Sequence, residues 1–258
     1  MAQIESDVDA ENSIGKDYGD DYLKWKKWEE LEFGKLSKSE AAYFAAEISR
    51  TKSPIPLNAR VLEIGFGNGS FLEFAKRNGW DVCGTEINEA LVEIAEKRGF
   101  NVEHSQDLSA FSDNGFDLIV AFDVLEHIPQ DLLPDFILEI KRILKGNGFF
   151  IARFPNGDSP FGLRFQNGDI THITSIGSGK IRYFAARANM EVIFAGGEAQ
   201  PLIGSSALHC VHRIVTLPIK KAVDLFVNAV FFPRNPIAFC SSNLTLVYKA
   251  TKGTHQQL

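Results

Sequence analysis

The feature that most constrains the fold is the glycine-rich segment EIGFGNG at residues 63–69, which lies between a strand pattern and a helix pattern. Residues 60–64 form a short apolar run typical of a buried strand, and residues 71–77 have helical spacing. Glycine allows backbone conformations and close approaches that other residues resist. A strand, a tight glycine turn and a helix in this order predict the first unit of a parallel α/β sheet.

The same alternation continues along the chain. Further strands are predicted at 81–87, 101–104, 116–122, 148–154, 191–194 and 243–249, with helices at 88–99, 132–144 and 181–188 between them. We therefore expect one doubly wound α/β domain over residues 55–250, with a mostly parallel seven-stranded sheet. A helical arm is expected over residues 22–54, including a helix at 39–48 with Ser39 as its N-cap.

The charges are unevenly distributed. The chain has 27 Lys and Arg, 33 Asp and Glu and a net charge of −6. Residues 1–21 hold seven acidic residues and one basic residue, and residues 199–258 hold six basic residues and one acidic residue. The first segment is expected to be a disordered tail, and residues 251–258 a second short tail. The negative net charge argues against a nucleic-acid partner.

Cysteine usage and the absence of targeting patterns indicate the cellular compartment. Cys83, Cys210 and Cys240 are odd in number and form no C-x-x-C pair, so a disulfide framework or structural zinc site is not expected. The acidic N-terminal segment lacks the basic and apolar regions of a signal peptide. No apolar run approaches the roughly 20 residues of a membrane-spanning helix. We expect a soluble cytoplasmic protein.

The spacing of the glycines distinguishes between nucleotide ligands. A dinucleotide-binding turn has the pattern G-x-G-x-x-G, whereas the third glycine here falls one position early and Ser70 stands in its place. A dehydrogenase is therefore disfavoured, and no lysine follows that would indicate a P-loop. Open α/β sheets bind ligands at the carboxyl ends of their strands. Acidic residues end or follow the second, third and fourth strands there, namely Glu86, Asp107 and Asp123.

These pieces together resemble class I S-adenosylmethionine (SAM)-dependent methyltransferases. The resemblance rests on the E-x-G-x-G-x-G segment, on Glu86 placed 21 positions after Gly65, on Asp107, and on the segment DVLEHI that begins at Asp123. It covers about residues 60–250 and implies SAM as the cofactor and an antiparallel last strand. The residues implied to bind the cofactor are Glu63, Gly65, Phe66, Gly67, Gly69, Glu86, Ile87, Asp107 and Asp123.

The resemblance also implies individual roles. Glu86 would accept hydrogen bonds from both ribose hydroxyls, and Asp107 would face the adenine amine. For Glu63 two interpretations stay open: it caps the turn, or it lies beside the cationic methionyl group, where a carboxylate is electrostatically favourable.

His127 is the first candidate for catalysis, because imidazole titrates near neutral pH and a hydroxyl acceptor needs a base or a metal. Its alternative role is to brace the loop. Asp123, Glu126 and His127 form D-x-x-E-H, which resembles the divalent-metal motif of ubiquinone-biosynthesis O-methyltransferases. The same spacing occurs in methyltransferases without a metal, so the metal question stays open.

A second cluster follows the fifth strand. The stretches PNGDSPFG (155–162) and GDITH (168–172) resemble the substrate loop of methyltransferases of bacterial surface-polysaccharide biosynthesis, which makes Asp169 and His172 a second acid/base pair. The resemblance implies O-methylation of a sugar hydroxyl on a surface-polysaccharide or glycolipid precursor. Two alternatives remain: a quinone-like or other lipid-associated small molecule as acceptor, and a SAM-binding protein without activity.

An apolar insertion occupies about residues 199–235. Apolar residues between 219 and 231 recur at i, i+3 and i+4, which predicts an amphipathic helix with Pro218 at its start and Pro233 beyond its end. Three alternatives are open for its apolar face. It packs on the sheet or over the active site, it forms a homodimer, or residues 212–234 dock peripherally on the anionic inner face of a membrane.

Overall fold

The structure is a computed structural model that describes Lys26, residues 30–202 and residues 207–251. The expected acidic tail at 1–21 and all but the first residue of the tail at 251–258 lie outside the described residues. The strands are β1 (Arg60–Ile64), β2 (Asp81–Glu86), β3 (Asn101–His104), β4 (Phe116–Phe122), β5 (Leu144–Pro155), β6 (Met190–Gly197) and β7 (Asn243–Ala250). The α-helices are α3 (Lys38–Ser49), α4 (Ser70–Arg77), α5 (Glu89–Lys97), α6 (Leu133–Ile143), α7 (Leu163–Gln166), α8 (Ser178–Arg187) and α9 (Ala207–Phe231), and two 3₁₀ turns are η1 (Glu30–Glu32) and η2 (Leu125–His127).

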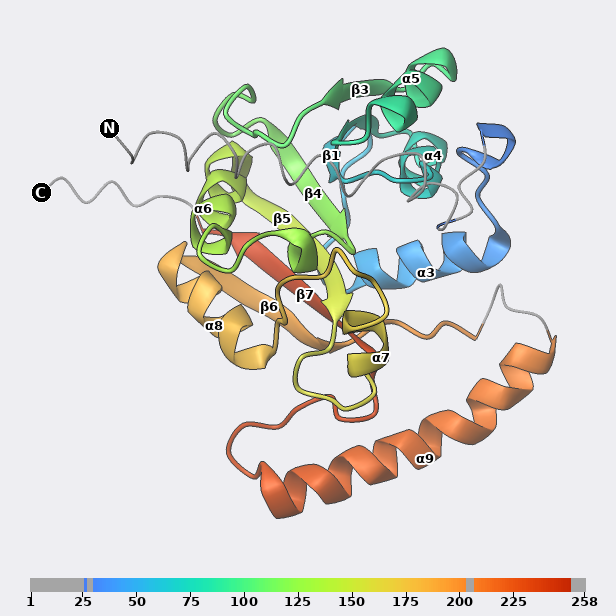
Figure 1. Ribbon diagram of the computed structural model, residues 1–258, viewed down its shortest axis with the longest axis vertical. Coiled ribbons are helices and arrows are strands. Elements are labelled where there is room, and N and C mark those ends of the chain that lie inside the picture. Colours follow the sequence, from blue (N-terminus) through green and yellow to red (C-terminus); the bar gives the residue numbers. More distant parts are fainter. Residues whose placement is uncertain (1–25, 27–29, 203–206, 252–258) are drawn as a thin grey trace, which may run out of the picture.

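One seven-stranded sheet crosses the molecule in the order β3-β2-β1-β4-β5-β7-β6 (Figure 1). The strands β3, β2, β1, β4 and β5 pair in parallel, and β7 lies antiparallel between β5 and β6. The predicted fold class, with its antiparallel last strand, is confirmed. From β1 the chain proceeds to β2 and β3 on one side of the sheet and then crosses to β4 on the other side. The direction of strand order therefore reverses beside β1, and such sheets bind ligands at this point.

The central strand β4 shows why both faces of the sheet are covered by helices. Leu118 and Val120 point to one face and Ile119 and Ala121 to the other, and all four are completely buried. Helices α6 and α8 pack on the second face. Helices α3 and α4 pack on the first face, and α5 extends that layer. The near-continuous apolar strand pattern thus reflects burial on two faces.

The N-cap of helix α3 lies two residues earlier than the sequence predicts. It is Ser37 and not Ser39: the Ser37 hydroxyl accepts a hydrogen bond from the Glu40 backbone N–H at 3.1 Å, and the Glu40 carboxylate accepts one from the Ser37 N–H at 2.9 Å. This reciprocal pair requires Glu three residues after the cap, and only Ser37 has it. Further along α3, the buried Glu47 forms an ion pair with Arg50 at 3.0 Å and accepts from Thr245 of β7, which holds the arm against the sheet.

The predicted amphipathic helix exists, but its start is wrong. Helix α9 runs through Pro218 and begins at Ala207. It lies apart from the two helical layers, at the bottom of Figure 1, and most of its apolar side chains are exposed. The alternative of packing on the sheet is therefore wrong for the described part of the helix. No helix among the described residues is both long and apolar enough to span a membrane.

Candidate active site

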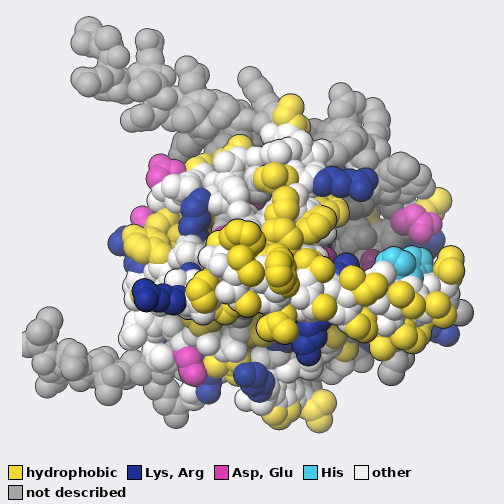
Figure 2. Space-filling model, turned by 90° about the horizontal axis from the view of Figure 1, so that it is seen from below, with side chains coloured by type: hydrophobic (Ala, Val, Ile, Leu, Met, Phe, Trp, Pro, Cys, Tyr) yellow, Lys and Arg dark blue, Asp and Glu magenta, His cyan; other side chains and the backbone are white. Residues whose placement is uncertain are grey.

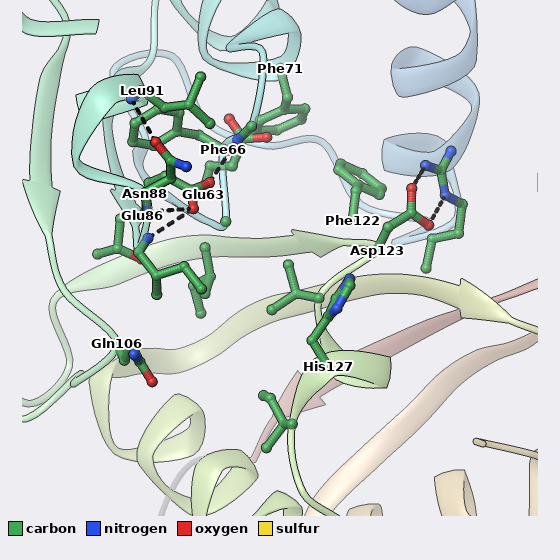
Figure 3. Close-up of a pocket in the computed structure, with 18 of the residues that line it drawn as sticks. Glu63, Phe66, Phe71, Glu86, Asn88, Leu91, Gln106, Phe122, Asp123 and His127 are labelled. Atoms are coloured by element: carbon green, nitrogen blue, oxygen red, sulfur yellow. Dashed lines mark hydrogen bonds and ion pairs between the residues drawn. The ribbon is translucent and has the colours of Figure 1, made fainter. Parts of the chain in front are cut away.

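A cavity of about 670 Å³ opens at the carboxyl ends of β1, β2 and β4. Its walls come from the loops that follow these strands, together with side chains of α3 and α6. In Figure 3, Glu63, Glu86 and Asn88 gather in one part of the cavity, and Asp123 and His127 lie in another. The volume suits a small molecule, and the location is the switch point of the sheet.

The glycine-rich turn forms the floor of the first part. Gly65, Gly67 and Gly69 all have positive φ angles, between 51° and 73°. A Cβ at Gly65 would lie 2.6 Å from the Val124 side chain of the loop after β4. Gly69 is the N-cap of α4, and a Cβ there would lie 2.6 Å from Phe33. The turn therefore needs glycine both for its conformation and for its close contacts.

The carboxylate of Glu86 connects the loops after β1 and β2. It accepts hydrogen bonds from the backbone N–H groups of Gly67 (3.0 Å), Ile87 (2.8 Å) and Asn88 (3.1 Å). Burial raises the pKa of Glu86, while these three hydrogen bonds oppose the rise. A carboxylate offers about four acceptor positions, so one remains for a donor from a ligand in the cavity.

Glu63 is a buried acid that faces the same cavity. Its side chain is almost completely inaccessible, and Oε2 has no hydrogen-bond partner. Burial, and then the nearby charge of Glu86, raise the pKa of Glu63 well above its usual value. A buried carboxylate without a partner is costly unless a donor or a cation reaches it. The cavity therefore fits a ligand that carries a positive charge near Glu63.

The residue predicted to contact adenine lies outside the cavity. Asp107 is exposed and does not line the cavity, and its carboxylate accepts hydrogen bonds from Ser109, including one from the backbone N–H at 2.8 Å. Ser105 and Gln106 line the cavity instead. The sequence thus predicts a loop that does line the cavity, but through the residues just before Asp107.

Asp123, at the end of β4, lines the cavity in an ion pair. The Nε of Arg153 donates to Asp123 Oδ1 at 2.9 Å, and a second nitrogen of the same guanidinium contacts Oδ2. That guanidinium also lies 5.2 Å from the ring centre of Tyr43 on α3. Tyr43 and Lys26 belong to the wall of the cavity and were missed, because a side chain on the arm carries no sequence signal for its position.

The catalytic candidates lie together at the second part of the cavity. The rings of His127 and His172 have centres 4.6 Å apart. His127 Nδ1 lies 3.2 Å from the carbonyl of Thr171, and His172 Nδ1 lies 3.0 Å from the carbonyl of Phe165. Because a carbonyl oxygen only accepts, Nδ1 carries the proton in both neutral rings and Nε2 is the acceptor. Burial, followed by the neighbouring His172, lowers the pKa of His127 to about 4.

Asp169 and His172, predicted as a pair, are within 3.6 Å of each other between Oδ2 and Nε2. Asp169 also forms an ion pair with Lys26 at 2.8 Å and accepts from the Thr171 hydroxyl at 2.6 Å. Burial alone would raise the pKa of Asp169, but these donors lower it below its usual range. His127 lines the cavity, whereas Asp169 and His172 lie behind it.

A candidate metal cluster exists, but with a different membership from the predicted one. One ligand atom each from Glu126, His127 and His172 lies within 4.8 Å of the others. Asp123 is not part of this group, because Arg153 pairs with its carboxylate. Both oxygens of Glu126 are buried without a hydrogen-bond partner, and burial raises the pKa of Glu126 well above its usual value. The donor set suits a divalent cation.

The sheet order, the glycine turn after β1 and the acid that ends β2 define the class of SAM-dependent methyltransferases, and SAM is the cofactor. The chain belongs to a family of methyltransferase domains, whose sequence pattern matches residues 37–194.

Known proteins with similar sequences or structures agree with this membership. An uncharacterized protein of Methanocaldococcus jannaschii is 34% identical over 147 residues, covering 56% of this chain and 62% of that protein. A ubiquinone biosynthesis O-methyltransferase of Xanthomonas oryzae is 31% identical over 98 residues, covering 35% of this chain and 40% of the enzyme. The chain thus spans less than two thirds of the length of these relatives.

Among solved structures, the fold is similar to that of a SAM-dependent methyltransferase from Archaeoglobus fulgidus. The two have a TM-score of 0.57 and 21% sequence identity, and the match covers 81% of this chain and 94% of the other.

We expect Glu86→Ala to lower the affinity for SAM at least about 30-fold, the equivalent of about 2 kcal/mol, since hydrogen bonds to a charged acceptor contribute on this scale. Calorimetric titration with SAM measures the effect. Glu86→Gln, which keeps the shape of the side chain, tests for loss of folding. Glu103→Ala, an exposed acid on β3, is the matched control and should bind as the parent does. Unchanged binding by Glu86→Ala would contradict the assignment.

Proposed function

We propose that this methyltransferase is an O-methyltransferase whose acceptor is a sugar hydroxyl of a surface-polysaccharide or glycolipid precursor. The observation that carries the proposal is the position of His127, which lines the cavity as a neutral imidazole with Nε2 as its acceptor nitrogen. A hydroxyl group becomes an adequate nucleophile when a base takes its proton.

The chemistry asks little of the protein beyond alignment and one proton transfer. SAM supplies a methyl group on a positively charged sulfur, so the methyl carbon is already activated. The acceptor oxygen forms a bond to that carbon while the carbon–sulfur bond breaks, and the thioether leaves without charge. His127 Nε2 takes the hydroxyl proton and later releases it to water. The carboxylate of Asp169 lies next to His172, which contacts His127. Its negative charge favours the imidazolium that forms when His127 takes the proton.

The cofactor roles follow from the two buried acids. We assign the remaining acceptor position of Glu86 to the ribose hydroxyls, and the unpartnered Oε2 of Glu63 to the cationic methionyl end. Gln106 replaces Asp107 as our candidate for the adenine contact, because it lines the cavity.

The acceptor class rests on the loop between β5 and α8, whose stretches at 155–162 and 168–172 resemble the substrate loop of surface-polysaccharide methyltransferases. Its buried Asn156 donates to the carbonyls of Ala238 and Ser241, and Asp158 accepts from the Ser178 N–H at the start of α8, so the loop is firmly held near the catalytic candidates. A quinone-like or other lipid-associated acceptor is the second candidate, favoured by the similarity to ubiquinone biosynthesis O-methyltransferases. A SAM-binding protein without turnover is the third hypothesis.

Mass spectrometry of the products distinguishes these candidates. The protein is incubated with SAM and with two separate extracts, one of glycan precursors and one of quinones and other lipids. We expect a product heavier by one CH₂ group in the glycan arm, together with demethylated cofactor. A product confined to the lipid arm would replace the sugar by the second candidate, and no product in either arm would favour the binding protein.

We expect His127→Ala to lower kcat at least about 100-fold and to leave SAM affinity within about twofold, because it removes the base and not the cofactor site. The pH profile gives a second readout. Since the base must be unprotonated and its pKa is about 4, kcat/KM should stay level from pH 8 to about pH 5 and fall below that. A fall centred near pH 6.5 would contradict this assignment.

A divalent metal is the alternative means of activating the hydroxyl. Glu126, His127 and His172 would hold it, and it would lower the pKa of an acceptor oxygen. Under the base proposal, removal of metal by a chelator leaves the rate unchanged within about twofold. A loss that divalent cations restore would replace the base by the metal. Cobalt(II) absorption provides a readout without turnover: only a metal site would give bands that disappear in His172→Ala.

A further inference from the structure

Helix α9 has the opposite polarity from an ordinary surface helix. Several of its polar side chains face the body: Asp224 accepts from the Cys240 N–H at 2.7 Å, and the Asn228 amide makes two hydrogen bonds to the backbone of Ile237, at 2.8 and 2.9 Å. Arg213 donates to the carbonyl of Pro201, and Arg213, Asp224 and Asn228 are all half-buried. A surface helix normally buries its apolar face and exposes the polar one.

Most apolar side chains of α9 point outward. Leu208, Leu225 and Phe226 are 79%, 73% and 65% exposed. Figure 2, which views the molecule from the α9 side, shows hydrophobic side chains gathered along the helix with Lys and Arg around them. The exposed apolar residues of this outer face are Leu208, Val211, Ile214, Val215, Ile219, Val223, Leu225, Phe226, Val230 and Phe231. A contiguous apolar patch of this kind marks an interaction surface.

The charges around the outer face identify the occupant. On α9 and in the segment just after it, Lys221 and Arg234 are exposed and Lys220 is half-buried, while the single acid of the helix, Asp224, turns its carboxylate to the Cys240 backbone. Two copies packed symmetrically through this face would bring the basic residues of both copies together. An anionic surface instead complements them and accepts the apolar side chains at the same time.

We propose that α9 docks in the plane of an anionic lipid membrane, with its outer face in the boundary between headgroups and acyl chains. The absence of a spanning helix among the described residues agrees with a helix that lies in this plane.

The loop between β5 and α8, called the acceptor loop below, is anchored to the segment that leads from α9 to β7. Phe161 contacts Phe239, with ring centres 5.8 Å apart, and Ser159 donates to the Phe239 carbonyl, in the segment that leads from α9 to β7. Phe161 and Leu163 of this loop are themselves half-exposed. Docking through α9 would therefore bring the acceptor loop to the lipid surface. This consequence rests on the proposed function, whereas the docking itself does not.

Co-sedimentation of the full chain with vesicles tests the proposal. Vesicles of phosphatidylglycerol and phosphatidylcholine are compared with vesicles of phosphatidylcholine alone, at low and high salt. The test variant is the double substitution Ile219→Ser and Phe226→Ser, both on the outer face. The matched control is Leu57→Ser, an apolar residue in the loop before β1 that is even more exposed than Ile219 and Phe226. Calorimetric SAM binding, measured on every variant, shows that each is folded and separates this test from that of the proposed function.

We expect the parent and Leu57→Ser to bind the anionic vesicles at least tenfold more tightly than the neutral ones, and the double variant to lose at least tenfold in affinity. Equal binding of the double variant and the parent would overturn the proposal. So would a parent that binds no vesicles but forms a dimer in analytical ultracentrifugation that the double variant does not form. Equal binding of the parent to both vesicle types would overturn the anionic specificity.

Discussion

The three hydrogen bonds of the Glu86 carboxylate are the interaction on which the site depends. They hold the glycine turn after β1 against the loop after β2, so two chain segments that diverge from the sheet enclose one cavity. The same carboxylate contributes to the electrostatic field that raises the pKa of Glu63. Two acids kept close together in a buried place are unfavourable for the empty protein, and a cationic ligand relieves both. The stability of the free protein and its affinity for the cofactor therefore oppose each other at these two residues.

Much of the fold was predictable because local patterns determine it. Strands β1, β3 and β4 begin and end at the predicted residues, since glycine and short polar turns border each apolar run. The errors in the fold occur at the starts of two helices. Ser37 and not Ser39 caps α3, because Glu40 completes the capping box. Pro218 lies inside α9 although an interior proline removes one backbone hydrogen bond and crowds the preceding turn, and the sequence pattern therefore treats it as a boundary. The periodicity located α9 but could not tell which side faces the body.

The site was predictable to the extent that strand ends position it. Glu63, Glu86 and His127 line the cavity, as their places at the carboxyl edge predict. Other contacts join distant segments and leave no local pattern. His172 approaches Glu126 because the N–H groups of Ile173 and Thr174 both donate to the Glu126 carbonyl, which no spacing rule encodes. The pairing of Arg153 with Asp123 across neighbouring strands likewise engages a carboxylate of the predicted metal set.

The contact between Gly65 and Val124 restricts which substitutions the two positions can accept during evolution. The space for a Cβ at Gly65 is already filled by a branched side chain from the loop after β4, and the backbone there has a positive φ. A larger residue at position 65 is tolerable only after position 124 has become smaller and the turn has altered its conformation. Positions 65 and 124, which are 59 positions apart in the chain, are therefore expected to change together. A relative that lacks glycine at the first position should also carry a different residue at the second.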